Sequence, residues 1–132
     1  MKISPNAPCP CHSGEKYKKC CQPYHRGILP SNALKLMRSR YSAYALNLSD
    51  YIIQTTHPNN PDYTDKIDEW ERSIQGFIQN TRFLGLKIDE FIEGETVAYV
   101  TFEVSLSSGL FKEKSRFLKE KGRWLYESGS FD

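Results

Sequence analysis

Residues 9–21 read CPCHSGEKYKKCC and hold all four cysteines of a 132-residue chain. The cysteines form two close pairs, Cys9 with Cys11 and Cys20 with Cys21, on either side of a polar, lysine-rich loop. A short segment of this composition buries too little apolar surface to fold by itself, so another source of free energy is required. The stretch therefore separates a small N-terminal unit from the body of the chain.

Two close pairs of cysteines around a turn provide the four soft ligands of a tetrahedral Zn²⁺ site. Ser13 and Gly14 supply turn chemistry after the first pair, since Gly14 can take a positive φ without steric cost. Disulfides or free thiols are the alternatives, but a bridge between the adjacent Cys20 and Cys21 would be strained, and no C-x-x-C redox pair is present. We predict one structural Zn²⁺ per chain, with these ligands: Cys9, Cys11, Cys20 and Cys21.

Four thiolates complete the coordination of Zn²⁺ and leave no position for water or substrate, so the predicted site is not catalytic. His12 or His25 could substitute for one cysteine, but four cysteines already suffice. Three lysines of the loop would offset the negative charge of the thiolates.

The charges of the chain are unevenly distributed. Residues 1–26 contain five basic side chains and one acidic side chain, a net charge of +4, whereas the remainder carries −2. No apolar run approaches the roughly 20 residues that span a bilayer, and the first ten residues lack the apolar stretch of a signal peptide. We therefore predict a cytoplasmic protein without membrane association, in a compartment where disulfides are rare.

The same thirteen residues resemble the SEC-C zinc motif, C-x-C-x-S-G-x-x-Y-x-x-C-[CH], known from the C-terminal tail of the bacterial preprotein translocase ATPase. The four cysteines match its zinc ligands, and Ser13, Gly14 and Tyr17 match its other characteristic positions. In the translocase the motif contacts a secretion chaperone and the ribosome, so the resemblance implies an interaction module. The expected contacts to protein, ribosome or RNA come from Lys16, Tyr17, Lys18 and Lys19.

The body of the chain shows helical patterns first and strand patterns afterwards, which is the order of an α+β fold. The spacing of apolar residues predicts a helix over 33–48 after the cap-type residues Ser31 and Asn32, and a short helix that stops before Pro58. A third helix, capped by Asp62 or Thr64, has its apolar stripe between residues 67 and 78. Alternating stretches at 82–92, 96–106, 110–120 and 123–129 predict a meander of about four antiparallel strands, covered by about three helices.

Two stretches of the body, LMRSRYSAYALNLSDYIIQTTHP (36–58) and KSRFLKEKGRWLYESG (114–129), resemble the YchJ-like family of bacterial proteins. The resemblance implies a SEC-C unit over 1–26 and, over 27–132, a cone-shaped domain of the nuclear-transport-factor-like superfamily. In this architecture a curved, mostly antiparallel sheet wraps around helices and leaves a pocket at the open end. Some members are small enzymes and many only bind ligands or proteins, and dimerisation through the sheet is frequent, so a homodimer is compatible with the resemblance.

Several side chains of the body are candidates for a pocket, each with a plainer alternative. His57 could be a general base, or a capping or hydrogen-bonded histidine. Glu103 could face inward, or it could face solvent or pair with a neighbouring strand. Arg38 and Arg40 could hold an anion or pair with acidic neighbours, while large aromatic residues serve as core or pocket wall. The predicted pocket residues are Arg38, Tyr41, His57, Trp70, Glu103, Ser115 and Trp124.

The sequence contains no Ser-His-Asp order, no phosphate-binding glycine loop and no second metal cluster, so it predicts no catalytic residues. The interpretation that we favour is a zinc-binding adaptor. Its zinc unit would contact a protein or the ribosome, and its cone would bind a small ligand or a polypeptide. The alternative is a small enzyme that acts on a ligand in the cone pocket. An inward-facing His57, Glu103 or Arg38 with a displaced pKa in a defined pocket would favour the enzyme.

Overall fold

The computed structural model describes residues 3–131 and confirms the α+β class. A short 3-10 turn, η1 (Tyr17–Lys19), precedes the helices. The helices are α1 (Gln22–His25), α2 (Ala33–Ala45), α3 (Ser49–Gln54) and α4 (Ile67–Gln79). The strands are β1 (Phe83–Ile92), β2 (Val97–Leu106), β3 (Gly109–Glu120) and β4 (Arg123–Phe131). None of the helices between residues 3 and 131 combines the length and the apolar character needed to cross a bilayer.

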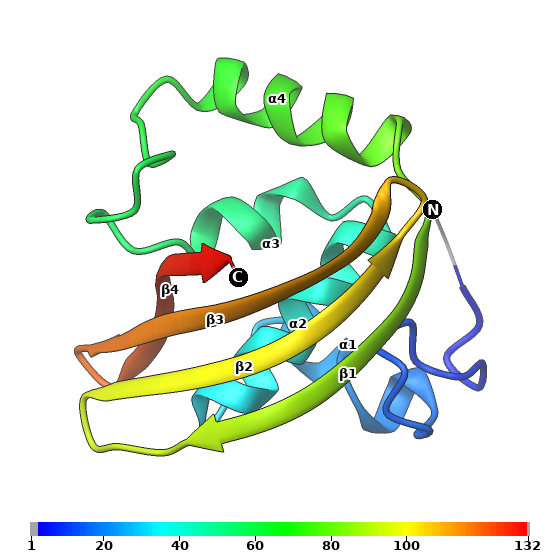
Figure 1. Ribbon diagram of the computed structural model, residues 1–132, viewed down its shortest axis with the longest axis horizontal. Coiled ribbons are helices and arrows are strands. Elements are labelled where there is room, and N and C mark those ends of the chain that lie inside the picture. Colours follow the sequence, from blue (N-terminus) through cyan, green and yellow to red (C-terminus); the bar gives the residue numbers. More distant parts are fainter. Residues whose placement is uncertain (1–2, 132) are drawn as a thin grey trace.

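The four strands form one antiparallel sheet in the order β1-β2-β3-β4, as the alternating sequence predicts. Figure 1 shows the sheet curving around the helices, with α4 on the far side of α3 from the sheet. Helix α2 packs against β2 and β4, and α3 packs between α2 and α4. Ala98, Val100 and Phe102 point from β2 into the core and are buried, so the concave face of the sheet is its apolar face.

Helix α2 is buried on more than one side. The side chain of Asn32 accepts a hydrogen bond from the backbone N–H of Lys35 at 2.9 Å, which confirms the predicted N-cap. Met37 and Tyr41 are buried as their spacing indicates, but Leu36 and Arg40 are buried too. The spacing of apolar residues predicts one buried face, whereas the sheet, α3 and the N-terminal segment all contact the helix. More of its surface is therefore buried than the sequence pattern indicates.

Helix α4 covers α3 with a conventional apolar face. Trp70, Ile74 and Ile78 are buried in a second hydrophobic cluster with Ile52 of α3. The predicted caps are wrong: the N-cap is Lys66 without a side-chain hydrogen bond, and the Thr64 hydroxyl only accepts from the backbone N–H of Lys66.

The N-terminal segment packs directly on the body. Cys9, Cys11, Tyr17 and Cys21 belong to the same hydrophobic core as Phe117 of β3. The ring of His25 connects the two parts, since its Nε2 lies 2.8 Å from the carbonyl oxygen of Ser39 in α2. A carbonyl can only accept, so Nε2 carries the proton, and Nδ1 accepts a hydrogen bond from the hydroxyl of Tyr17 at 2.6 Å. Both ring nitrogens are thus engaged in holding the segment against α2.

His25 makes the stability depend on pH in a definite direction. Burial lowers the pKa of His25 from the usual value of 6.5, so the unfolded chain binds a proton under conditions where the folded chain does not. Its stabilising contribution is therefore present above pH 6.5 and is lost as the pH falls, by at most about 1.4 kcal/mol per pH unit. We expect the free energy of unfolding of His25→Gln, measured by urea titration from about pH 7 to about pH 5, to fall less steeply than that of the wild type.

Both proteins contain the four cysteines, so protonation of the thiolates contributes to both slopes and cancels in their difference. His12→Asn is the matched control, because His12 is exposed and asparagine tolerates its positive φ of 63°. Equal slopes for the wild type and His25→Gln would contradict the assignment of His25 as a buried, neutral ring.

Candidate functional site

The loop of the N-terminal segment brings the four cysteines together. The N–H of Cys9 donates to the carbonyl of Glu15 at 2.8 Å, and the N–H of Tyr17 donates to the carbonyl of Ala7 at 2.9 Å. Gly14 turns the chain between these bonds with a φ of +88°, as expected for a turn glycine. The 3-10 turn η1 then directs Cys20 and Cys21 back toward the first pair.

The geometry of the sulfur atoms fits a tetrahedral metal ion. All four Sγ atoms lie within 4.8 Å of one another. Cys11 and Cys20 are 3.5 Å apart at sulfur, and Cys20 and Cys21 are 3.9 Å apart. A tetrahedral ion with metal–sulfur bonds of about 2.3 Å places its ligands about 3.8 Å from each other. The cysteine cluster (Cys9, Cys11, Cys20 and Cys21) is therefore compatible with a bound metal ion, as the sequence predicts.

The protonation of the cluster also favours a cation. Hydrogen bonds from the thiols of Cys21 and Cys9 lower the pKa of Cys11. The contact with Cys11 raises the pKa of Cys9 to about 12, and the contacts with Cys11 and Cys9 raise that of Cys21. A divalent ion would stabilise all four sulfurs in the deprotonated form, because the thiolate is the form of cysteine that binds metal.

Arg38 lies beside the cysteine cluster and does not line the cone, which corrects its predicted position. Its Nη1 donates to the carbonyl oxygen of Cys11 at 3.1 Å and lies 3.9 Å from the Cys11 sulfur. The guanidinium therefore places a positive charge beside the thiolates, from a helix of the body.

The lysines of the loop and the tyrosine between them have different environments. Lys16, Lys18 and Lys19 are exposed and available to a partner. Tyr17 is only 6% exposed, because its ring packs in the core and its hydroxyl bonds to His25. Burial raises the pKa of Tyr17 to about 12, so its hydroxyl stays a donor. Tyr17 is not available to stack on a base, which corrects its predicted role in partner binding.

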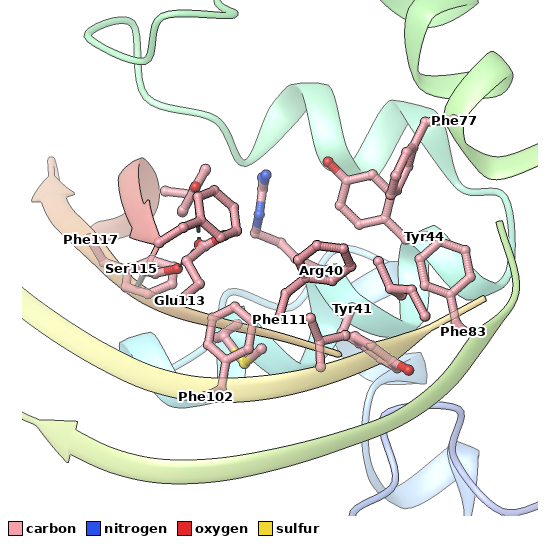
Figure 2. A pocket seen from close by; sticks show the side chains of 15 residues that line it. Arg40, Tyr41, Tyr44, Phe77, Phe83, Phe102, Phe111, Glu113, Ser115 and Phe117 are labelled. Carbon is pink, nitrogen blue, oxygen red and sulfur yellow. Dashed lines mark hydrogen bonds between the residues drawn. The ribbon is translucent and has the colours of Figure 1, made fainter. Parts of the chain in front are cut away.

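A cavity of about 300 Å³ lies inside the cone, with walls from α2, α4 and all four strands (Figure 2). Aromatic rings form most of the wall. At one end the rings of Tyr44, Phe77 and Phe83 contact one another, with centroids 5.8 to 6.2 Å apart. Phe102 and Phe117 line the cavity from the sheet. We call this space the cone cavity.

Arg40 is the positively charged residue of the cone cavity. It is 8% exposed, and its Nη1 donates to the carbonyl of Ile52 at 3.0 Å and to the hydroxyls of Thr55 at 2.7 Å and Thr56 at 3.2 Å. The guanidinium carbon lies 4.6 Å from the centre of the Tyr126 ring, a cation–π contact. In Figure 2 the side chain stands between Tyr44 and the Glu113–Ser115 group.

Glu113 is the acidic residue of the cone cavity. Its carboxylate accepts hydrogen bonds from the hydroxyl of Ser115 and, at 3.3 Å, from that of Tyr126. Burial, followed by the charge of Glu113, raises the pKa of Tyr126, so this hydroxyl remains protonated. Gly129 lies opposite Ser115 in β4, and a Cβ atom there would collide with the Glu113 carboxylate.

Two of the predicted pocket residues, Tyr41 and Ser115, line the cone cavity. His57 lies elsewhere: its Nε2 is 2.7 Å from Glu120, its Nδ1 accepts from the N–H of Asn59, and its own N–H donates to the carbonyl of Tyr126. His57 is therefore a hydrogen-bonded histidine, and its bonds attach the segment after α3 to β3 and β4.

Three further predictions for the cavity are also corrected. Glu103 points to the outer face of the sheet, where its carboxylate lies 3.8 Å from Lys87. The alternation of apolar and polar residues along β2 already indicated that Glu103 faces outward. Trp124 is a core residue, 4% exposed, and Trp70 lies beside a separate hollow next to α4.

Sequence reasoning missed the residues that give the cone cavity its chemistry, namely Glu113 and Tyr126, and left Arg40 undecided between a pocket and an acidic neighbour. The cavity is assembled from elements that are far apart in the sequence, so no local pattern marks it. The one available signal for the cavity was Arg40, a charged residue within a helix that is otherwise largely apolar.

Comparison with known proteins places both parts of the chain. The model of the YchJ middle, NTF2-like domain matches residues 32–129, and the model of the SEC-C motif matches residues 6–23. A UPF0225 protein of Sodalis glossinidius is 36% identical over 121 residues, which cover 85% of this chain and 75% of that protein.

Solved structures agree with this assignment. The solution structure of a SEC-C motif containing protein from Rhodopseudomonas palustris has a TM-score of 0.79 at 31% identity, covering 94% of this chain and 98% of that one. A crystal structure of a SEC-C motif containing protein from Psychrobacter arcticus has a TM-score of 0.76 at 29% identity, covering 94% and 82%. The chain belongs to the YchJ-like UPF0225 family of bacterial proteins, with a SEC-C motif ahead of an NTF2-like domain.

Proposed function

We propose that this chain is a zinc-stabilised binding protein. Zn²⁺ held by the cysteine cluster would fix the N-terminal segment to α2, and the cone cavity would bind a small, largely apolar molecule. Four cysteines kept as metal-bound thiolates suit a reducing compartment, so we propose the cytosol as its location.

The observation that carries the ligand-binding part is the cone cavity itself. Its volume of about 300 Å³ falls at the lower end of the range of small-molecule sites, and its aromatic walls with a few converging polar groups are typical of them. Burial raises the pKa values of its three tyrosines, Tyr41, Tyr44 and Tyr126, so their hydroxyls stay protonated at neutral pH. The hydroxyls of Tyr41 and Tyr126 donate within the protein, to Gly85 and Glu113. Fixed donors and one engaged carboxylate favour recognition of a ligand over proton transfer.

The choice of zinc follows from the donor set. Four thiolates in a closed tetrahedron are the preferred ligands of structural Zn²⁺, and hard cations such as Mg²⁺ or Ca²⁺ bind oxygen instead. The contacts of Arg38 with Cys11 and of His25 with Ser39 connect this site to α2, so the free energy of metal binding would stabilise the body as well.

We expect the purified protein to contain one zinc ion per chain by elemental analysis, and Cys20→Ser to lose most of it. Removal of zinc by a strong chelator should lower the midpoint of thermal unfolding of the whole chain, because the cysteines share its core. His12→Asn, which changes a neighbouring exposed side chain, should keep the metal. Retention of one zinc by Cys20→Ser together with its loss from His12→Asn would contradict the ligand set.

Ligand binding in the cone cavity can be tested with a variant whose larger side chain fills the space. Val104 lines the cavity from β2, so Val104→Trp should occupy the space that a ligand needs. We expect a neutral aromatic probe such as 3-phenylpropanamide to shift the amide NMR signals of β2, β3 and α2 in the wild type, and to shift them at least about tenfold less in this variant at equal probe concentration.

Thr101→Trp is the control for this experiment, because Thr101 lies on the same strand and alternates to the other face. It should bind the probe like the wild type. Equal shifts in wild type and Val104→Trp would place the probe outside the cone cavity and refute the proposal.

A second proposal concerns the exposed face of the N-terminal segment, where Lys16, Lys18 and Lys19 lie. We propose that this basic face contacts an acidic partner surface such as ribosomal RNA. Changing all three lysines to glutamate should abolish co-sedimentation with ribosomes at low salt, since phosphate contacts dominate such binding. The same charge change at Lys87, Lys112 and Lys114, on strands of the sheet, should have little effect. Equal loss in both variants, or binding that is insensitive to salt, would exclude a specific contact.

A further inference from the structure

Arg40 is a buried cation without an anionic partner in the part of the chain that the structure describes. Among residues 3–131, its guanidinium has no carboxylate within 4.0 Å, and the charged pairs of the chain involve other residues. A charged group that is only 8% exposed and unpaired is costly, because burial removes its hydration. Such a group in a cavity indicates a ligand that supplies the missing charge.

The free edge of the guanidinium has a defined shape. All hydrogen bonds between Arg40 and the described part of the chain come from Nη1. Nε and Nη2 have no partner there, and these two nitrogens form the edge of the guanidinium that can donate two parallel hydrogen bonds. A planar carboxylate accepts such a pair side by side, and this bidentate arrangement is both stronger and more directional than a contact to a point charge.

The position of Arg40 is fixed in advance of any ligand. The hydroxyls of Thr55 and Thr56 donate their protons to the carbonyls of Tyr51 and Ile52, each at 2.7 Å, so only their lone pairs face Nη1 of Arg40. The ring of Tyr126 covers one face of the guanidinium. A ligand therefore meets a donor edge that loses little conformational freedom on binding.

Glu113 does not supply the missing charge, although it lies in the same cavity. Its Oε2 is occupied by the hydroxyls of Ser115 and Tyr126, which hold it on the side of β3 and β4. The opposite wall, with Tyr44, Phe77 and Phe83, is aromatic. The cone cavity thus offers one donor edge in its middle and an apolar surface beside it.

We propose that the ligand of the cone cavity is a small aromatic carboxylate, with its carboxylate bound to Nε and Nη2 of Arg40 and its ring against Tyr44, Phe77 and Phe83. The inference rests on the proposed ligand-binding function and adds the chemical class. The size agrees: about 300 Å³ is the volume of about ten water molecules at about 30 Å³ each, which suits one ring with a short acidic chain.

The test compares three probes that share one body: 3-phenylpropanoate, 3-phenylpropanamide and 3-phenylpropylamine. Each is titrated into the ¹⁵N-labelled full chain, and the dissociation constant is taken from amide shifts of residues that line the cone cavity. We expect the carboxylate to bind about tenfold or more tightly than the amide, because hydrogen bonds between charged groups exceed neutral ones by this order. The amine should bind most weakly.

The variant Arg40→Lys keeps a positive charge but removes the paired donors, and it should reduce the affinity for the carboxylate to that for the amide. Arg116→Lys is the matched control, because Arg116 pairs with Glu127 and does not line the cone cavity. If Arg40→Lys does not fold, the three probes on the wild type still decide the question.

Equal affinities for the carboxylate and the amide would overturn this inference and leave the proposed ligand binding intact. Tighter binding of the amine would also overturn it, because Glu113 would then be the anchor. Failure of all three probes to shift the cavity residues at millimolar concentration would refute the proposed ligand binding, and the inference with it.

Discussion

The burial of α2 is the constraint on which both sites depend. Its side chains at positions 38 and 40 are two residues apart, so on a helix of 3.6 residues per turn they point to nearly opposite sides. Arg38 consequently reaches the carbonyl of Cys11, while Arg40 enters the cone cavity. A helix that is covered by the N-terminal segment on one side and by the sheet on another can direct one charge to each site.

The N-terminal segment and the cone are therefore one packed structure with two kinds of chemistry. The cysteine cluster is dense in sulfur and held by backbone turns, with Tyr17 and His25 as internal supports. The cone cavity is aromatic, and its polar groups are fixed by side-chain bonds to α3 and β4. Because α2 contributes residues to both sites, a shift of α2 caused by repacking of the cysteine cluster would also move the wall of the cavity.

Local patterns predicted most of the fold and about half of the site chemistry. The period-2 alternation of β2 and the cap at Asn32 depend on neighbours in sequence, and the spacing of the cysteines contains a complete ligand set. The sequence could not show which of Arg38 and Arg40 lines the cavity. The helix is buried on several sides, so the spacing of its apolar residues does not show which side faces the cavity. Glu113 and Tyr126 acquire their roles only when β3 and β4 pair, with Gly129 leaving room for the carboxylate.

The order of the elements along the chain has a consequence for biosynthesis. The cysteines leave the ribosome well before Phe117 and Trp124, which share their core. At about 5–20 residues per second, the four thiols wait on the order of 5–20 seconds for the strands that bury them. During that interval the nascent segment is open to oxidation, so early capture of a metal ion would protect the sulfurs before the domain can do so.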